Sequence, residues 1–465
     1  MPALMIQGAS SSSGKSLLTT ALARAFARRG VDVVPFKAQN MSNNARVAAG
    51  GEIGVAQYLQ ALAAGVEPDV RMNPVLVKPE GDNRSQVVVL GRPDLGLSRL
   101  PWRARPDALW QPIAKALAGL LAEHELVLIE GAGSPAEINL RTTDLANMRT
   151  AFAAGAEVVL VADIDRGGAF AHLYGTWALL PPEERACLCG FVLNKFRGDV
   201  RLLPPAPEQL EALTGIATLG VIPWLDHALP DEDGAATPTY SGDFRVAVIR
   251  YPTASNLDEF KALEDVAALC WACRPADLDA DLVVLPGSKH VAADLEWLRE
   301  RRLDRAVLAR ADLGLPVLGI CGGMQMLGRR LIDQGGVDGD ALGLGLLPLE
   351  TTFVETKVAA RIETSFLALP NPWSSLSGET FSGYEIRHGH SVAVGPAVAA
   401  LPDARGFVAG PVLGVSVHGL FENTATVAAL VGRASERSLT AVFDDLADAV
   451  EEHLDVARLL EIARS

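Results

Sequence analysis

Residues Met5 to Ser16 read MIQGASSSSGKS, in which an apolar run leads into a Gly/Ser tract that ends in Gly14-Lys15-Ser16. The ending is that of a phosphate-binding P-loop, but a standard P-loop has about four residues between its two glycines. Here Gly8 comes one residue too early, and Ala9 occupies the expected place. The helical stretch Leu17 to Arg29 follows directly, so the loop amides and the helix dipole would favour a phosphate. The stretch therefore predicts a nucleotide-binding α/β domain.

The residues of this loop suit a nucleoside triphosphate and its metal ion. Lys15 is expected to pair with the β- and γ-phosphates, and the Ser16 hydroxyl is expected to reach Mg²⁺. The predicted ATP-binding residues are Gly8, Ser13, Gly14, Lys15, Ser16, Lys37 and Asn194. The longer glycine spacing resembles that of dethiobiotin synthetase and its ATP-dependent carboxylate-activating relatives. ATP and Mg²⁺ are therefore the predicted cofactors.

Length, composition and charge limit the classes of protein to which the chain can belong. Its 465 residues are too many for one ordinary hydrophobic core and indicate two or three domains. Hydrophobic residues make up 49% and charged residues 21%, as in well-packed globular proteins. The net charge of −15 would repel nucleic acid and anionic membranes, so neither is an expected partner. The sequence shows neither a signal-peptide pattern nor a membrane-spanning run, and we expect a cytoplasmic protein.

Strand-like apolar runs alternate with helical stretches, which predicts two α/β domains with mostly parallel sheets. In the first half the predicted strands are Leu4 to Gln7, Val31 to Phe36, Leu126 to Ile129, Val158 to Ala162, Gly190 to Leu193 and Thr218 to Ile222. The second unit begins at FRVAVIRYP (244–252), continues through DLVVLPGS (281–288) and LPVLGICGG (315–323), and ends near GVSVHGLFEN (414–423).

A change of composition separates the two units. The stretch DHALPDEDGAATPTYSGD (226–243) is rich in Pro, Gly and acidic residues and lacks periodicity, as interdomain linkers do. We therefore predict an ATP-binding domain over residues 1–228, a linker over 229–243 and a second domain over 244–433. The tail, residues 434–465, has apolar residues at helical spacing. We expect it to form a helix or helix pair packed on the second domain.

Two charged residues of the first unit stand where predicted strands end. LVLIEGAG (126–133) ends in Glu130 and a glycine turn, which puts the carboxylate at the edge of the sheet where α/β ligands bind. The predicted metal ligands are Ser16 and Glu130, because both offer the oxygen atoms that Mg²⁺ prefers. Lys37 could contact the γ-phosphate or a substrate carboxylate. A second acidic ligand stays unassigned, and the candidates are Glu52, Asp163 and Asp165.

The second unit contains the pattern of an activated nucleophile. LPVLGICGGMQML (315–327) is an apolar strand, a turn with glycines around Cys321, and a helix expected to begin at Met324. A thiol on such an elbow is exposed to a substrate, and the helix N-terminus favours its thiolate. Cys321 is therefore the predicted nucleophile of an acyl-transfer reaction. The backbone N–H groups of Gly287, Ser288 and Gly322 are the predicted oxyanion hole.

A thiolate site needs a base, and histidine is the usual choice. His418 lies in GVSVHGLFEN (414–423), where another strand is followed by glycine. His388 and His390 in GYEIRHGHS (383–391) are the rival pair. We predict His418 as the catalytic base.

Several long blocks of the first unit resemble one family closely and in order. The blocks are PFKAQNMSNNARVAAGGEIGVAQYLQALAAGVEPDVRMNPVLVKP (35–79), SQVVVLG (85–91), IEGAGSPAEINLRTTDLANMRTAFAAGAEVVLVADIDRGGAF (129–170) and GFVLNKFRGD (190–199). They resemble the cobyric acid synthases, a family of glutamine-dependent amidases of cobalamin biosynthesis. The resemblance covers essentially the whole chain, because the second unit resembles that family's class I glutamine amidotransferase domain. It implies a dethiobiotin synthetase-like first domain.

The resemblance also implies a reaction and its partners. Glutamine and a corrinoid would be the substrates, and a homo-oligomer stays open. Adenosylcobyrinic acid a,c-diamide would be amidated at its b, d, e and g carboxylates to give adenosylcobyric acid, through an acyl phosphate and ammonia from glutamine. The alternatives are a cobyrinic acid a,c-diamide synthase or, in a different class, a P-loop regulatory ATPase with an inert amidotransferase-like domain.

The chain departs from the expected patterns at three places. Where some carboxylate-activating relatives have an aspartate, this chain has amides that could bind a polar substrate: Gln39, Asn40, Asn43 and Asn44. Arg387 stands after GYEI, where the resemblance leads us to expect a histidine. Class I amidotransferases usually carry a glutamate two residues after the histidine, but here that residue is Leu420, and Glu422 follows later. Either a Cys-His dyad operates or another carboxylate reaches His418.

Overall fold

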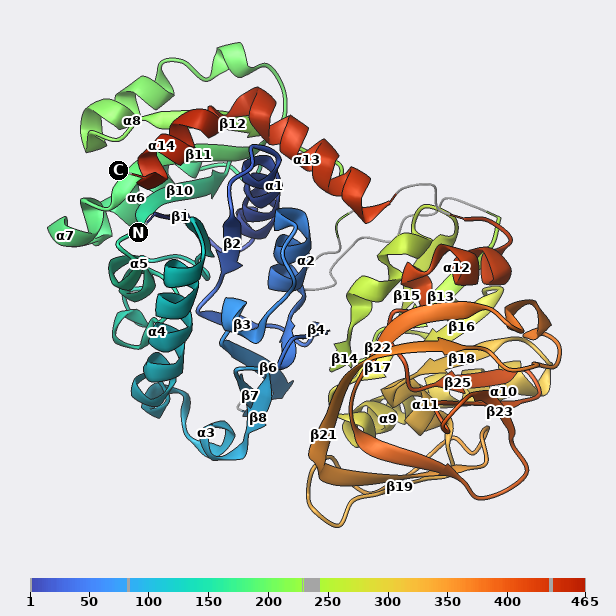
Figure 1. Cartoon of the computed structure of the whole chain (residues 1–465). Coiled ribbons are helices and arrows are strands. Elements are labelled where there is room, and N and C mark those ends of the chain that lie inside the picture. Colours follow the sequence, from blue (N-terminus) through green and yellow to red (C-terminus); the bar gives the residue numbers. More distant parts are fainter. Residues whose placement is uncertain (1, 82–83, 228, 230–242, 435–437, 465) are drawn as a thin grey trace.

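The computed structural model describes residues 2–81, 84–227, 229, 243–434 and 438–464, which form two α/β domains lying side by side (Figure 1). The predicted linker, residues 229–243, lies outside the described residues except for Leu229 and Asp243. The sheets of both domains are mostly parallel, which confirms the predicted fold class.

The first domain is built on a six-stranded sheet in which every neighbouring pair is parallel. In spatial order its strands are β12 (Thr218–Pro223), β11 (Leu188–Phe196), β10 (Glu157–Asp163), β1 (Ala3–Gly8), β9 (Leu126–Glu130) and β2 (Val33–Phe36). All six predicted strands of this half are therefore present. Their apolar runs are continuous because helices cover both faces of the sheet.

Alternate residues of β1 face opposite helical layers. Leu4 and Ile6 belong to a core shared with α1 (Lys15–Arg28) and α2 (Val55–Ala64). Ala3 and Met5 belong to the core on the other face. The helices there are α4 (Pro106–Glu123), α5 (Met148–Ala154), α6 (Ala169–Leu179) and α8 (Ala206–Thr214).

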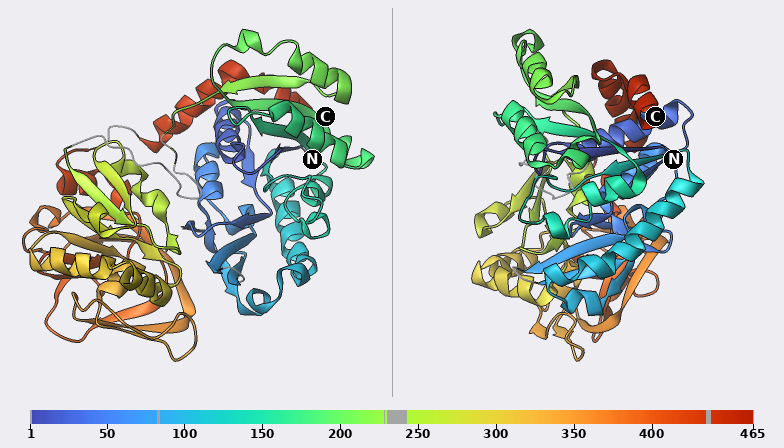
Figure 2. Two further views of the ribbon diagram at one scale, coloured as in Figure 1. Left: turned by 180° about the vertical axis from the view of Figure 1, so that it is seen from behind. Right: turned by 90° about the vertical axis from the view of Figure 1, so that its left-hand side faces the viewer.

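The C-terminal tail packs on the first domain, so its expected position on the second domain was wrong. It forms α13 (Leu439–His453) and α14 (Val456–Arg464). Leu446 and Val450 are buried in the same core as Leu18 and Leu22 of α1. Both ends of the chain consequently lie on the first domain (Figure 2).

A smaller set of strands projects from the first domain toward the second (Figure 1). One sheet contains β3 (Gln39–Met41), β6 (Val75–Gly81), β7 (Arg84–Val89) and β8 (Arg92–Asp94). Beside it β4 (Ala45–Ala48) and β5 (Gly51–Gly54) form an antiparallel hairpin, in which Arg46 is opposite Ile53. We call residues Ala45–Gly54 the bridging hairpin.

The second domain is built on a seven-stranded sheet. Its strands in spatial order are β15 (Ala268–Ala272), β13 (Arg245–Ile249), β16 (Leu282–Leu285), β18 (Val317–Ile320), β25 (Val412–Val415), β24 (Gly406–Ala409) and β23 (Val398–Leu401). The first five are parallel, and the last two continue the sheet antiparallel. The four segments predicted for this unit lie on β13, β16, β18 and β25.

Helices and a long hairpin complete the second domain. The helices are α9 (Val291–Glu300), α10 (Leu303–Asp312), α11 (Gly322–Leu327) and α12 (Thr424–Val431). The hairpin, β21 (Leu349–Ser365) with β22 (Thr380–Ala393), was not predicted. A short ladder joins β14 (Ala254–Ser255) to β17 (Gly287–Ser288). Within the described ranges, no helix combines the length and apolarity that crossing a membrane requires.

Candidate active sites in the two domains

Cys321 stands on a sharp turn between β18 and α11. Its backbone has φ 51° and ψ −105°, which is strained for a residue other than glycine. The helix begins at Gly322, two residues before the predicted start at Met324. The side chain is 6% exposed, and its sulfur lies 3.7 Å from the carbonyl oxygen of Ile386. The strain, the turn and the helix start are the features of a nucleophile elbow.

His418 lies close enough to Cys321 for the two side chains to interact, and a third residue orients the imidazole. Glu259 lies in the 3₁₀ segment Leu257–Leu263 and brings Oε1 to 2.9 Å from His418 Nδ1. Its other oxygen accepts a hydrogen bond of 2.8 Å from the N–H of Gly419. A carboxylate thus reaches the histidine from elsewhere in the chain, which was one of the two alternatives that the sequence left open. The arrangement is a nucleophile–base–carboxylate triad.

The charges around His418 stabilise its protonated form. Burial alone would lower the pKa of His418, but the charges of Cys321 and Glu259 and their hydrogen bonds raise it to about 10. The side chains of His418 and Glu259 are 2% and 0% exposed. Because the pair is shielded from water, its charges interact strongly. The imidazolium is therefore the form of His418 that this environment favours.

The other two candidate histidines, His388 and His390, lie on β22. His388 Nδ1 is 3.1 Å from the carbonyl oxygen of Val354, and burial with nearby lysines lowers its pKa to about 4. His390 lies 3.3 Å from Arg387. Glu422, the later carboxylate after His418, is paired with Arg46 of the first domain. Of the three histidines, His418 is the one that the structure brings to Cys321.

The predicted oxyanion hole lies against the nucleophile turn. A Cβ added to Gly322 would lie 2.7 Å from the Ser288 nitrogen, and one added to Gly287 would lie 2.7 Å from His418 Cε1. The N–H of Lys289 donates to Thr253 O at 2.9 Å. Because successive N–H groups of an extended strand point in opposite directions, the N–H of Ser288 points away from β14. Of the residues in this ladder, Ser288 is therefore the one whose N–H is better placed to donate to an oxyanion.

Lysine and asparagine side chains of the first domain bond to backbone oxygens in and beside its P-loop. Lys15 Nζ lies 3.2 Å from the carbonyl oxygens of Ser10 and Gly133. Asn194 Nδ2 donates to Ser13 O at 2.9 Å. Gly14 has φ 91°, and a Cβ there would lie 2.0 Å from Asn194 Nδ2, so the close approach requires glycine. Asn194 thus braces the loop that would hold the phosphates.

Several polar side chains donate hydrogen bonds to Glu130 beside this loop. Its Oε1 lies 2.8 Å from both Ser16 Oγ and Lys37 Nζ. Its Oε2 accepts from Gln60 Nε2 at 2.6 Å and lies 3.4 Å from Gln57 Nε2. Burial opposes ionisation, but Lys37 and these hydrogen bonds hold the pKa of Glu130 below its usual range. Ser16 and Glu130 together offer the hard oxygen atoms that suit Mg²⁺.

The candidates for a second acidic metal ligand are all engaged in ion pairs. Asp163 pairs with Lys195 at 3.0 Å, and Asp165 pairs with Arg197 at 3.1 Å. Glu52 lies at the domain interface, where it pairs with two lysines. No group of three His, Cys, Asp or Glu side chains able to hold a metal occurs among the residues that the structure describes. Glu52 therefore serves the interface rather than the P-loop.

The side-chain amides predicted to bind a polar substrate lie in two different regions of the structure. Asn40 Nδ2 lies 3.3 Å from Gln57 Oε1, near Glu130, and Gln39 is its neighbour on β3. Asn44 Oδ1 accepts a hydrogen bond of 3.2 Å from the N–H of Leu257, in the second domain. Asn43 lines the pockets between the domains. The amides thus extend from the neighbourhood of Glu130 to the interface.

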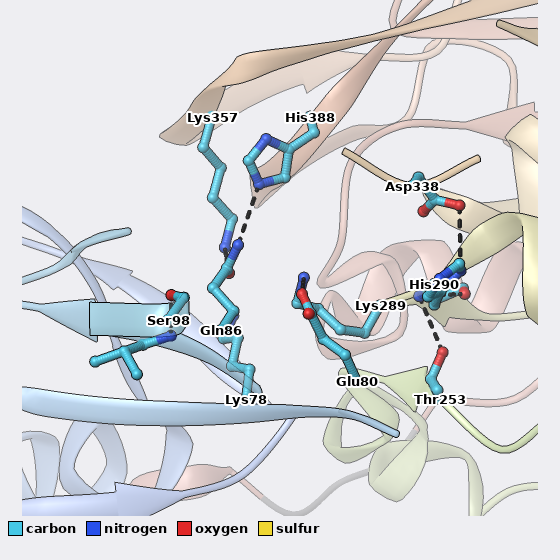
Figure 3. A network of polar contacts seen from close by, with 12 residues as sticks. Lys78, Glu80, Gln86, Ser98, Thr253, Lys289, His290, Asp338, Lys357 and His388 are labelled. Carbon is cyan, nitrogen blue, oxygen red and sulfur yellow. Dashed lines mark hydrogen bonds and ion pairs between the residues drawn. The ribbon is translucent and has the colours of Figure 1, made fainter. Parts of the chain in front are cut away.

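Lysines surround a pocket that extends from Cys321 to the first domain. Figure 3 shows Lys357 and His388 of the long hairpin directed toward Gln86 and Lys78 of the small sheet. Lys357 Nζ lies 2.6 Å from Glu52 Oε1 and 3.1 Å from Gln86 Oε1. Burial and neighbouring lysines lower the pKa of Lys357 to about 7 despite Glu52.

A further lysine joins the domains at the same pocket. Lys289, next to the predicted oxyanion loop, pairs with Glu80 at 2.8 Å (Figure 3). The pocket is lined by Cys321 on one side and by Asn43 and Lys78 on the other. The nucleophile of the second domain thus shares a pocket with residues of the first.

Several residues at these sites were not found from the sequence. Gln57 and Gln60 had a readable signal, because two glutamines three residues apart interrupt the otherwise apolar helix VAQYLQALAA (55–64). Glu259 and Arg46 had no such signal in the sequence, since their partners lie 159 and 212 residues away.

Comparison with known proteins gives two matches to family models. The model described as CobQ/CobB/MinD/ParA nucleotide binding domain matches residues 4–233. The model described as CobB/CobQ-like glutamine amidotransferase domain matches residues 245–426. The two matches fall on the two domains described above.

Curated relatives match almost the whole chain. A cobyric acid synthase of Variovorax paradoxus (strain S110) is 53% identical over 480 residues, covering 98% of both chains. One of Paracidovorax citrulli (strain AAC00-1) is 55% identical over 483 residues, covering 98% of this chain and 97% of the relative. Among solved structures, a glutamine amidotransferase covers 44% of this chain and 98% of its own with a TM-score of 0.32 and 18% identity.

Proposed function

The chain belongs to the cobyric acid synthase family, and from this membership we propose that it amidates the b, d, e and g carboxylates of adenosylcobyrinic acid a,c-diamide to give adenosylcobyric acid. The family membership makes it a glutamine-hydrolysing, ATP-dependent amide ligase of cobalamin biosynthesis. Its substrates are glutamine and a corrinoid, and we expect it to act in the cytoplasm.

The second domain would release ammonia from glutamine. The Cys321 thiolate attacks the side-chain amide carbon, and the N–H of Ser288 stabilises the oxyanion that forms. The imidazolium of His418 gives its proton to the leaving nitrogen, which departs as ammonia and leaves a γ-glutamyl thioester. His418 then takes a proton from water, whose oxygen attacks the thioester and restores the thiolate. Glu259 holds the imidazole in the orientation that both proton transfers need.

The first domain would activate the corrinoid carboxylate. Lys15 and the loop amides would neutralise charge on the phosphoryl group as it passes from ATP to a carboxylate oxygen. Ammonia then attacks the acyl phosphate and displaces phosphate, which forms the amide. Ser16 and Glu130 would hold Mg²⁺, which supplies additional neutralisation of the phosphates when it is bound. Lys37 pairs with Glu130 at 2.8 Å, and we expect it to contact the transferred phosphoryl group.

The pocket between the domains would carry the ammonia. Ammonia is mostly protonated in neutral water, and the ammonium ion is not a nucleophile. A path that starts at Cys321 and ends at Asn43 and Lys78 would deliver it without exposure to solvent. The observation that carries the proposed function is this shared pocket, with a Cys-His-Glu triad on one side and the P-loop domain on the other.

Mass spectrometry of the corrinoid product tests the proposal. With MgATP and glutamine we expect up to four amide conversions of the a,c-diamide. A product limited to two conversions, from cobyrinic acid, would indicate the alternative activity of a cobyrinic acid a,c-diamide synthase. Absence of both glutamine hydrolysis and corrinoid amidation would favour the regulatory ATPase.

Removal of the nucleophile separates the two half-reactions. Cys321→Ala should abolish glutamine-dependent amidation but retain amidation driven by ammonium at high pH, because the first domain is unchanged. Cys270→Ala is the matched control, since Cys270 lies on β15 away from His418. If Cys321→Ala still hydrolysed glutamine, the assignment of the nucleophile would be wrong.

A further inference from the structure

The segment between β2 and α2 reaches from the ATP site to the glutaminase site and returns. Its first end is held at Glu130, because Lys37 Nζ lies 2.8 Å from Glu130 Oε1. Its second end returns to the same carboxylate through Gln60, whose Nε2 lies 2.6 Å from Oε2. Between these ends stands the bridging hairpin, Ala45–Gly54. The hairpin is thus tied on both sides to a residue that borders the P-loop.

Arg46 carries the hairpin's contact with the second domain. Its guanidinium forms ion pairs with Asp258 and Glu422 and lies 4.8 Å from the centre of the Tyr384 ring. The arginine side chain is only 6% exposed. Asn256 reinforces the junction by donating hydrogen bonds to Ala45 O at 2.8 Å and to the Tyr384 hydroxyl at 2.7 Å.

The three partners of Arg46 are also the residues around His418. Asp258 directly precedes Glu259, which orients the imidazole. Tyr384 stacks on His418 with ring centres 5.4 Å apart and exchanges two backbone hydrogen bonds with it. Glu422 ends the 3₁₀ turn that follows the histidine. A displacement of Arg46 would therefore disturb residues on several sides of the catalytic histidine.

The charges at this junction depend on Arg46. Asp258, Glu259 and Glu422 are three neighbouring carboxylates, and the first two are almost completely buried. Burial raises the pKa of Asp258, and the charge of Arg46 opposes this effect. Without the arginine, the negative charge beside the Glu259–His418 pair would change.

The pairing at the junction is also incomplete. Among the described residues, Arg46 Nη1 and Asp258 Oδ1 are buried without a hydrogen-bond partner. Buried polar groups of this kind are costly, so a rearrangement that pairs them would be favoured.

We propose that the bridging hairpin couples the two active sites, so that ligands bound beside Glu130 set the position of Arg46 and, through it, of the Glu259–His418 pair. The inference rests on the proposed function and names the element and the residue through which ATP and the corrinoid, bound in the first domain, would accelerate glutamine hydrolysis. Arg46 is a positioning residue, because it acts through Glu259 and Tyr384 and contacts no reacting atom. Such coupling prevents ammonia from being released without an acceptor.

The test is the ratio of glutaminase kcat with and without MgATP and the corrinoid a,c-diamide. In the wild type we expect stimulation of about 5-fold or more, the range of ordinary allosteric coupling. In Arg46→Gln the ratio should fall to about one, because the charged junction is lost. Amidation driven by ammonium should persist in that variant, since the P-loop and Glu130 are untouched.

Arg361→Ala is the matched control, because Arg361 on β21 also contacts the bridging hairpin. Its side chain crosses the interface to Val47 O at 3.2 Å and to Glu67 at 2.6 Å. Its backbone pairs with Tyr384 in the β21–β22 ladder, but the substitution leaves the backbone in place and removes only the side-chain contacts. It should keep the stimulation of the wild type. If it loses the stimulation as Arg46→Gln does, any loosening of the interface suffices and the special role of Arg46 is wrong.

The remaining outcomes are also decisive. An unstimulated wild type, or full stimulation in Arg46→Gln, would overturn the coupling. If Arg46→Gln does not fold, Arg46→Lys replaces it, because lysine keeps the charge but loses the planar fork that can hold two carboxylates. Full stimulation in Arg46→Lys, with an unchanged KM for glutamine, would then overturn the proposal. Failure of the wild type to amidate the corrinoid at all would instead contradict the proposed function.

Discussion

His418 receives its support from segments that are far apart in the chain. Glu259 bonds its Nδ1, Tyr384 stacks on its ring, and Cys321 lies on its other side. Each of these neighbours is buried, so water does not compete for the imidazole. The consequence is a histidine whose proton is retained far above neutral pH.

Glu259→Gln tests this support through the pH profile. The pKa of His418 is raised to about 10, so the imidazolium is present at neutral pH and is lost as the pH rises through that value. Removal of the Glu259 charge lowers this pKa and moves the alkaline limb of glutaminase kcat to lower pH. By analogy with other triads, kcat should fall by up to about 10⁴-fold.

A nearby glutamate provides the control for this prediction. Glu264 pairs with Lys261 at 2.6 Å and lies five residues beyond Glu259, at the end of the same segment. Glu264→Gln should leave both kcat and the alkaline limb unchanged. An alkaline limb that stays in place in Glu259→Gln would show that the carboxylate does not set the charge of the histidine.

The site residues were predictable where their signal is local. Cys321 and His418 each follow an apolar strand and precede glycine, and this pattern is readable within about ten residues. Glu259 has no such pattern, because its partner is 159 residues away and its own segment is irregular. Only the folded chain shows that the missing carboxylate comes from Glu259 and not from Glu422.

At the scale of elements, α13 is the clearest departure from expectation. Its amphipathic pattern identifies a helix with one apolar face but does not say which surface that face covers. In the structure the face covers α1, and Arg24 pairs with Asp444 at 2.8 Å along the edge of the contact. The long β21–β22 hairpin was not predicted for a related reason, because few of its residues are fully buried and it lacks a continuous apolar run.

Two substitutions at the α1–α13 contact separate burial from ion pairing. Leu446→Ala should destabilise the first domain by about 2–5 kcal/mol, because it removes a fully packed side chain. Arg24→Ala should cost less than about 1 kcal/mol, since the ion pair is partly exposed to water. Native-state hydrogen exchange of amides in β1 and β10 measures the free energy of opening in both variants. Equal effects would mean that charge, rather than apolar contact, holds the tail.

At the scale of the whole molecule, the nucleophile of the second domain shares a pocket with residues of the first domain. The pocket is lined by charged and polar side chains, among them Lys78, Lys289 and Lys357. These side chains pair across the interface with residues of the opposite domain, except for Lys78, which pairs within its own. The interface is therefore held by polar contacts that also line this pocket.

Isotope competition tests whether the proposed ammonia path is closed. With ¹⁵N-amide glutamine and unlabelled ammonium in the solvent, the wild-type product should carry mainly ¹⁵N. Asn43→Phe should admit unlabelled nitrogen and release ¹⁵N-ammonia, because Asn43 lines the pocket on the side of the first domain. Mass spectrometry of the product gives the ratio. Equal incorporation of both isotopes by the wild type would mean that ammonia mixes freely with the solvent.

The packing of α13 on α1 also fixes the order in which the first domain is completed during synthesis. The face of α1 that α13 covers is translated before the second domain, and α13 is translated after it. The second domain can fold in the meantime, as domains generally do as units. The first domain is therefore completed only after the second, and until then the apolar face of α1 is not covered by α13.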